Sequence, residues 1–286
     1  MRKSPLTATL PHYLASLSPK VYTCPELCSI IRDFAKAINN PLDAEPDDYL
    51  QHYVKLRKIN SIELSGAKGA IQRYALHNPS PLEVGQQLKK GGYFSHQTAA
   101  YIHGLVDEET ITYYVSTEAS SNISNGYELN QQAIDTAFGK EQRKSGAAYQ
   151  WENYQFILLT SLDRGKMGVE KKGPYAVTGL ERTLLDITVR PAYCGGAKKI
   201  LQAYNKVLPY ICVRTLVKML DKMDFTYPYH QSLGFYLSRA GYTGQELKKL
   251  SRRRRPFTFY IDYAIKDPVY SGDWNLFYPN ALDNLV

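Results

Sequence analysis

Long hydrophobic runs are missing from this 286-residue sequence, whose longest apolar stretches are short segments such as 156–160 and 208–213. A helix needs about 20 consecutive apolar residues to cross a bilayer, so the sequence predicts neither a membrane span nor a membrane partner. The first residues, MRKSPLTATLPHYL, have a basic tip but neither a continuous apolar stretch nor a small-residue cleavage pattern. We therefore expect a cytoplasmic protein.

Cysteine is also scarce, since the chain contains only Cys24, Cys28, Cys194 and Cys212. Four cysteines in a chain of this length do not make a disulfide framework, and a reducing compartment is the simpler setting. Cys24 and Cys28 have the spacing of one helix face, but no nearby Cys or His completes a four-ligand zinc set. Cys194 has no assignable base beside it, which leaves a nucleophilic role without support. We expect free thiols, no metal and no cofactor.

The short motifs of common enzymes are absent as well. No GxxxxGK[ST], GxGxxG, HExxH or GxSxG segment occurs, so the sequence predicts a protein that is not an enzyme. One enzymatic alternative remains open, because Asp163 followed by Glu170-Lys171-Lys172 imitates the pattern of metal-dependent restriction-type nucleases, in which paired carboxylates hold Mg²⁺. The segment Asp163-Arg164-Gly165-Lys166 also fits a charged turn between strands.

Positive charge exceeds negative charge in this sequence, and the excess is unevenly distributed along the chain. The chain has 35 Lys+Arg against 27 Asp+Glu, a net charge of +8. Residues 1–77 contribute +3, residues 78–190 contribute −2, and residues 191–286 contribute +7. The 44% hydrophobic content indicates a globular chain of about two domains. Two basic ends around a neutral middle are typical of a protein that contacts an anionic polymer.

The N-terminal third predicts three helices and a hairpin. The expected elements are a helix over 6–17, a second helix capped by Thr23 and ending near 39–41, a third helix that begins at Asp47-Asp48 and continues through YLQHYVKLRKI, and strands at 61–64 and 71–76. The third helix is expected to bury Leu50, Tyr53, Val54 and Leu56. This order of elements is that of a winged helix-turn-helix, which we assign to residues 1–77.

The exposed face of the predicted third helix supplies the first set of candidate DNA-binding residues. Lys55 and Lys58 would attract phosphates, whereas Gln51 and His52 would reach base edges in the major groove. The hairpin adds the cationic side chains Lys68 and Arg73. Any solvent-facing helix displays residues of these types, so the pattern by itself also fits an ordinary helix surface.

Residues 78–286 predict a second, larger domain of mixed helices and strands, which makes the whole chain an α+β protein. Helices are expected at 82–92, 96–104, 131–138, 180–187, 197–207, 211–223, 231–240 and 244–250, and strands at 111–116, 154–162, 174–177, 257–264 and 273–279. In this domain Ser95 has the position of a helix N-cap, and Thr178-Gly179-Leu180-Glu181 fits a capping box. His103 is expected to interact with the dipole at the end of its helix, and Arg182 with Asp186 as an intrahelical ion pair.

Two segments of this domain, YFSHQTAAYIHGL and VTGLERTLLDIT, carry a family resemblance. The matching residues are Phe94, Ser95, Thr98, Ala99, His103, Gly104, Leu105, Thr178, Leu180, Glu181, Arg182, Thr183, Leu184 and Asp186. The sequence resembles the AbiEi family, the antitoxins of type IV toxin-antitoxin systems associated with phage defence. The wing sequence LSGAKGAIQRYAL departs from the usual Arg-Gly-aromatic ending in that family.

The resemblance implies a transcriptional regulator that represses its own operon. It implies binding to operator DNA with inverted repeats through the winged helix, and neutralisation of a cognate nucleotidyltransferase-like toxin through a C-terminal antitoxin domain, residues 78–286. A plain transcription factor, whose larger domain senses a ligand or mediates assembly, remains the non-enzymatic alternative.

A second candidate nucleic-acid contact lies near the C-terminus. Six of the eight residues from 248 to 255 are basic: Lys248, Lys249, Arg252, Arg253, Arg254 and Arg255. Neutralising phosphates releases counterions, so such a run favours a polyanion partner, either the operator or an RNA. A solvated helix end is the simpler alternative.

Overall fold

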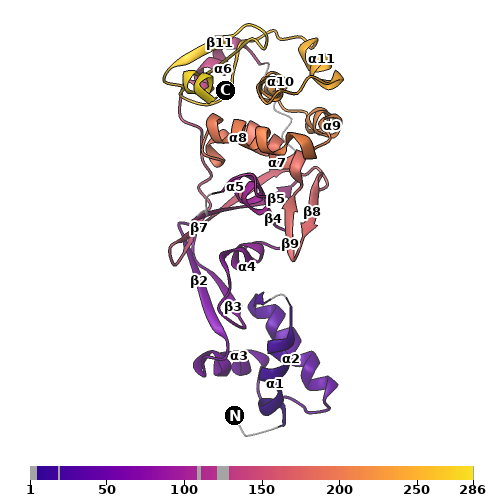
Figure 1. Ribbon diagram of the computed structural model, residues 1–286. Helices are drawn as coiled ribbons and strands as arrows, with labels where there is room; N and C mark the ends of the chain where they lie inside the picture. The colour runs from indigo at the N-terminus through magenta and orange to yellow at the C-terminus, as the bar shows by residue number, and fades with distance from the viewer. Residues whose placement is uncertain (1–4, 19, 108–110, 121–128, 286) are drawn as a thin grey trace.

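The computed structural model describes residues 5–18, 20–107, 111–120 and 129–285 of an elongated α+β protein (Figure 1). The N-terminal helices lie at one end, a curled nine-stranded sheet runs through the middle, and most of the later helices gather at the other end. The mixed fold class expected from the sequence is therefore confirmed at this level.

The element bounds are as follows. The α-helices are α1 (Pro5–Ser16), α2 (Cys24–Ala37), α3 (Pro46–Lys55), α4 (Pro81–Gln86), α5 (His96–Ile102), α6 (Gln131–Phe138), α7 (Leu180–Val189), α8 (Ala197–Val207), α9 (Val213–Met223), α10 (Tyr229–Arg239) and α11 (Gln245–Ser251). The strands are β1 (Val21–Tyr22), β2 (Asn60–Gly66), β3 (Ile71–Ala75), β4 (Tyr93–Phe94), β5 (Thr112–Ala119), β6 (Ala148–Trp151), β7 (Tyr154–Leu162), β8 (Val169–Lys172), β9 (Tyr175–Thr178), β10 (Phe259–Tyr260), β11 (Pro268–Ser271) and β12 (Leu276–Pro279). The 3₁₀ segments are η1 (Pro191–Tyr193), η2 (Leu208–Tyr210) and η3 (Asn280–Leu285).

Helices α1 to α3 share one apolar core. Leu10, Leu27 and Leu50, one from each helix, are fully buried there. Thr23 begins α2 with the expected cap, because its backbone N–H donates to the Glu26 carboxylate at 2.8 Å and its hydroxyl accepts the Glu26 N–H. The first two predicted helices are confirmed.

The third helix is shorter than the sequence predicts. It ends at Lys55, because Arg57 has a left-handed φ of 55° and the N–H groups of Lys58 and Ile59 both turn back to the Tyr53 carbonyl. Lys58 therefore lies outside the helix. The expected burial of Leu56 was wrong, since 53% of this residue is exposed.

Strand β2 joins the N-terminal elements to the rest of the molecule. The sheet order is β1-β3-β2-β6-β7-β5-β4-β9-β8, so β2 has β3 on one side and β6 on the other. Its last two residues pair with β6, as Ser65 opposite Gln150 and Gly66 opposite Tyr149. The predicted hairpin is confirmed, and it extends a sheet that crosses the domain boundary expected at residue 77. Short strands such as β1, β4, β6, β8 and β11 were not predicted.

The C-terminal half encloses the largest apolar core. Helices α7, α8 and α10 contribute Leu184, Ile200 and Leu233, each fully buried. A separate three-stranded sheet, in which β12 pairs in parallel with β10 and antiparallel with β11, places Leu276 and Phe259 against the same core. The two late strands expected from alternation are thus confirmed in shortened form.

Helix α7 differs from its prediction at its first turn. The capping box at Thr178 does not form, because Gly179 is the N-cap and the Glu181 carboxylate instead accepts the Cys212 N–H at 2.8 Å. The predicted Arg182–Asp186 pair does form at 2.8 Å, but it is almost fully buried. Removing one partner of a buried pair leaves an unpaired buried charge and lowers the stability of the fold by about 3–5 kcal/mol. Loss of one partner is therefore more costly here than in a surface ion pair.

In the described part of the chain, we find no helix that is both long and apolar enough to span a membrane.

The junction between β2 and β6 leads to a prediction about stability. A Cβ atom at Gly66 would lie 2.7 Å from the Tyr149 ring and 2.9 Å from the Ala148 carbonyl oxygen. We expect Gly66→Ala to lower the free energy of unfolding by about 1–3 kcal/mol, because both strands would have to separate. Denaturant unfolding measures the change, and hydrogen exchange should localise it to β6.

Gly146→Ala is the matched control, because nothing lies within 4 Å of a Cβ there. This variant should match the parent or gain less than about 1 kcal/mol. Equal stability of the two variants would show that β2 and β6 do not approach as closely as described.

Candidate nucleic-acid interface

Helix α3 positions three of the predicted DNA-binding residues on one surface. Tyr49, Leu50 and Tyr53 are buried against α1 and α2 and fix the rotation of the helix. The same rotation leaves Gln51 and Lys55 exposed one turn apart, with a half-buried His52 beside them. The structure therefore brings Gln51, His52 and Lys55 together.

The charges of α3 are divided along its axis. Asp47 and Asp48 lie in the first turn, whereas Lys55, Arg57 and Lys58 are exposed at and just beyond the last turn. This distribution complements the helix dipole, which favours anions at the N-terminus and cations at the C-terminus. A phosphate backbone would meet cations only near the C-terminal end. Arg57 was not among the residues predicted for this surface; it follows the end of α3 and has a left-handed φ of 55°.

The two hairpin candidates lie elsewhere. β2 has seven residues and at about 3.4 Å per residue spans roughly 20 Å, so the turn that holds Lys68 lies beside β6 rather than beside α3. Lys68 is exposed there. Arg73 is committed to an internal contact, because its guanidinium donates to the carbonyls of Gln87 and Leu88 at 2.7 and 3.0 Å. Burial lowers the pKa of Arg73, and Glu26 opposes that effect.

The basic run at 248–255 is at the opposite end of the molecule from α3 (Figure 1). Arg253 forms a bidentate pair with Asp221 at 2.6 and 3.0 Å, and Arg255 donates to the Asp273 carbonyl and lies over the Trp274 ring. Lys249 pairs with Glu246 at 3.5 Å. Among the described residues, no ion pair or side-chain hydrogen bond is found for the other three cations, Lys248, Arg252 and Arg254, which are exposed.

The two segments that carry the family resemblance meet in space. α5 packs on α7, and His103 at the end of α5 donates from Nε2 to the Thr178 carbonyl at 2.7 Å. Lys172 donates to the other ring nitrogen at 3.1 Å. Burial lowers the pKa of His103, and the Lys172 charge acts in the same direction. His103 thus joins the segments as a neutral bridge, which corrects the expected contact with its own helix dipole.

A buried polar cluster lies at the start of α5. Ser95 stands at the N-cap position but does not cap through its side chain; its Oγ contacts His96 Nδ1 at 2.8 Å and Ser116 Oγ at 2.6 Å. Thr98 accepts the Tyr114 N–H at 2.7 Å. Burial, and then the charges of Arg190 and Arg182, lower the pKa of His96 to about 3. Because Ser95 is fully buried, this Ser–His contact supports packing rather than attack on a substrate.

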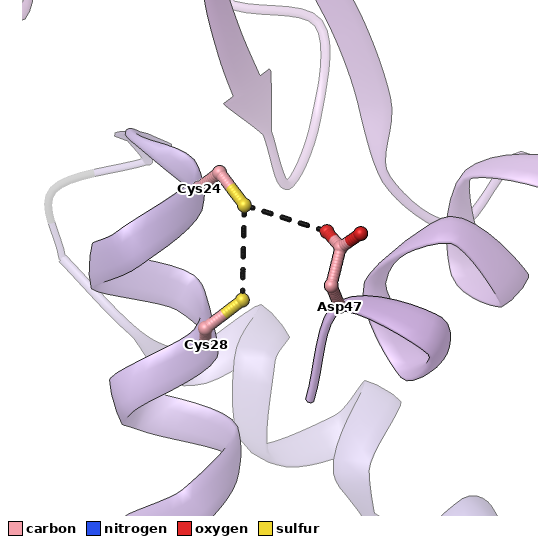
Figure 2. A group of neighbouring side chains, drawn as sticks. All are labelled: Cys24, Cys28 and Asp47. Atoms are coloured by element: carbon pink, nitrogen blue, oxygen red, sulfur yellow. Dashed lines mark hydrogen bonds between the residues drawn. The ribbon is translucent and has the colours of Figure 1, made fainter. Parts of the chain in front are cut away.

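The residues of the nuclease alternative are not gathered into a metal-binding group. Asp163 accepts the Gly165 N–H at 2.9 Å, which makes it the first residue of a turn. Within the described ranges, the only group of three potential metal ligands consists of Cys24, Cys28 and Asp47 (Figure 2). Burial, followed by the hydrogen bonds to Cys28 and Asp47, raises the pKa of the Cys24 thiol to about 12. This group was not predicted from the sequence, because Asp47 belongs to α3 whereas both cysteines belong to α2.

The pKa of His96 leads to a prediction about acid stability. The unfolded state protonates His96 near pH 6.5 and the native state only near pH 3. Between these values the unfolded state binds more protons, so this residue makes stability fall with acidification by up to about 1.4 kcal/mol per pH unit. We expect His96→Asn to remove this contribution to the pH dependence of the free energy of unfolding, measured by denaturant titrations between about pH 6 and about pH 4.

Asparagine is chosen because residue 96 has a φ of 51°, a conformation that Asn tolerates. Gln51→Asn, at an exposed residue of α3, removes no ionisable group and is the control, so it should keep the parental slope. An unchanged slope in His96→Asn would mean that His96 is not buried in its neutral form.

No family model matches the sequence. No curated protein matches it either. Among solved structures, the chain is similar to the crystal structure of the RV2827C protein from Mycobacterium tuberculosis, with a TM-score of 0.61 and 12% sequence identity over 96% of this chain and 92% of that one. At this level of identity the likeness concerns the fold alone, and it extends over both ends of the molecule.

Proposed function

We propose that the N-terminal elements are a winged helix-turn-helix that binds DNA through α3, and that the protein is an antitoxin and autorepressor of the type IV class. The observation that carries the DNA-binding half is the polar surface of α3 with exposed cations at and just beyond its C-terminal end. It is held by a buried face against α1 and α2 and followed directly by the antiparallel β2–β3 hairpin. This order of elements is the one that presents a third helix to the major groove.

The side chains on α3 suggest a division of roles. Lys55, Arg57 and Lys58 are cations suited to phosphates, which fix the position of the protein on the duplex. Gln51 can read adenine through two hydrogen bonds, and His52 lies beside it. The acidic first turn of α3 would be repelled by phosphates, so the C-terminal half of the helix is the part that approaches the DNA backbone.

The antitoxin half is supported by the resemblance of α5 and α7 to the AbiEi family and by the direct contact between them. The His103–Thr178 hydrogen bond joins the end of α5 to the residue before the N-cap of α7, and the buried pair of Arg182 and Asp186 lies within α7. The proposed partner is a nucleotidyltransferase-like toxin encoded by a neighbouring gene, and the proposed operator contains inverted repeats that two copies of the chain would occupy. No enzymatic activity is proposed.

The exposed cations of α11 and the following residues form a separate contact. Because they lie at the far end of the molecule from α3, a short operator half-site bound by α3 would not reach them (Figure 1). Lys248, Arg252 and Arg254 are therefore proposed to bind a second stretch of polyanion, either DNA or RNA.

For DNA binding, we expect Lys55→Ala combined with Lys58→Ala to weaken the affinity for DNA from upstream of the gene. Each lost phosphate contact should lower the slope of log K against log salt by about one, because fewer counterions are released. Fluorescence anisotropy at several salt concentrations measures both quantities. Lys140→Ala combined with Lys144→Ala removes the same charge from exposed positions in the larger domain and should leave the slope unchanged. Identical behaviour of the two double variants would exclude α3 as the DNA-binding helix.

For the antitoxin role, we expect the full-length protein to restore growth of cells that express the neighbouring toxin gene. The Lys55→Ala and Lys58→Ala variant should still restore growth while losing repression of a promoter reporter, because neutralisation is assigned to the larger domain. Repression without any restoration of growth would instead indicate a plain transcription factor.

A further inference from the structure

Two cysteines and a carboxylate converge where α2 and α3 begin (Figure 2). Cys24 is the first residue of α2, Cys28 lies one turn later on the same face, and Asp47 lies in the first turn of α3. The Cys24 and Cys28 sulfurs are 3.7 Å apart, and the Cys24 sulfur is 3.4 Å from Asp47 Oδ1. All three potential ligand atoms lie within 4.8 Å of one another.

These separations agree with tetrahedral zinc coordination. Zn–S bonds of about 2.3 Å and a Zn–O bond of about 2.0 Å require S···S and S···O separations of roughly 3.8 and 3.5 Å at the tetrahedral angle. The observed 3.7 and 3.4 Å differ from these values by about a tenth of an ångström each. The third separation, between Cys28 Sγ and the Asp47 carboxylate, is within 4.8 Å.

The choice of ligands indicates the class of metal. Two thiolates select soft or borderline ions such as zinc and disfavour magnesium and calcium, which prefer oxygen ligands. The surroundings also fit: Cys28 is buried, Cys24 is half-buried and Asp47 is exposed, so a fourth position would face water. Gln51 donates to Asp47 Oδ1 at 3.4 Å, which is the kind of outer contact that orients a ligating carboxylate.

We propose that Cys24, Cys28 and Asp47 form a binding site for a thiophilic divalent cation of the zinc class, with water as the fourth ligand. The cation binds the two thiolates and the carboxylate, and the two thiol protons pass to solvent. It connects the start of α2 to the start of α3 and so fixes the direction of α3. The effect on α3 deepens the proposed function and rests on it, whereas the cation site itself does not.

The site can be tested on the full-length reduced protein without DNA. Cobalt(II) titration should give one equivalent of a tetrahedral, thiolate-bound species, recognised by sulfur-to-cobalt charge-transfer absorption and by the visible bands of four-coordinate cobalt. Zinc should displace the cobalt and remove both signals. A zinc-binding chelator dye then measures the affinity by competition.

Three conservative variants and one control assign the ligands. Cys24→Ser, Cys28→Ser and Asp47→Asn should each weaken zinc binding by more than about 100-fold, because losing a direct ligand costs at least as much as losing an outer-shell contact. Cys212→Ser removes an exposed thiol outside the group and should bind zinc like the parent. Circular dichroism and thermal unfolding without metal identify any variant that fails to fold. If one ligand variant does not fold, the cobalt spectra of the other two ligand variants test the site.

Several outcomes would overturn the site. Equal zinc affinity of Cys28→Ser and the parent would do so, as would a cobalt spectrum without thiolate charge transfer. After removal of metal by a chelator, protection of Cys24 and Cys28 from alkylation that only a reductant reverses, while Cys212 reacts, would show a disulfide in place of a metal pair.

A separate measurement distinguishes the cation site from DNA binding. With zinc bound, the parent should bind upstream DNA at least tenfold more tightly than after chelation, whereas Asp47→Asn should show no such difference. Zinc binding without any DNA binding would leave the site intact and reject the proposed function. DNA binding with no cobalt or zinc signal would reject the cation site and leave the proposed DNA-binding function intact.

Discussion

The architecture depends on β2 having two partners. Without β6, the N-terminal elements would have only a small sheet, made of β2, β3 and the two-residue β1. Because Ser65 and Gly66 continue into pairing with β6, the hairpin becomes part of a nine-stranded sheet in which β5 and β7 are paired along their whole length. The direction of α3 is therefore linked to the larger domain through hydrogen bonds along one continuous strand.

Arg73 and Gly66 show how closely that junction is built. Arg73 reaches from β3 to the carbonyls at the end of α4, where the backbone has no helical partners left. Gly66 allows β2 to approach the Tyr149 ring more closely than any side chain would permit. Both residues looked like parts of a DNA-contacting wing in the sequence. In the structure Arg73 contacts the end of α4 and Gly66 lies against Tyr149 of β6, so both residues attach the hairpin to the rest of the molecule.

Buried polar contacts have a comparable role around α5 and α7. Arg182 and Asp186 are buried and pair with each other, and the partly buried His103 donates to the Thr178 carbonyl. Groups of this kind stabilise one arrangement over others because misplacing them leaves a charge or donor unpaired. The segments that carry the family resemblance accordingly contain several buried polar residues, among them Ser95, Thr178 and Thr183.

The sequence by itself determined the elements whose signals are local. The Thr23 cap, the apolar stripes of α2 and α8, the hairpin and the strand at 154–162 all follow from contacts within a few residues, and each was predicted. Prediction failed at two helix ends. α3 ends at Lys55 because Arg57 is left-handed, and the Thr178 cap does not form because the Glu181 carboxylate accepts the N–H of Cys212, which is far away in the sequence.

Only the tertiary structure decided which distant residues act together. It places Lys68 and Arg73 away from α3, and the two basic segments at opposite ends, because strand pairing rather than charge fixes their separation. It also brings Asp47 to Cys24 and Cys28, across the turn between two helices. Sequence spacing describes the surface of one element, whereas a site built from several elements depends on how their buried faces pack, and that information is not local.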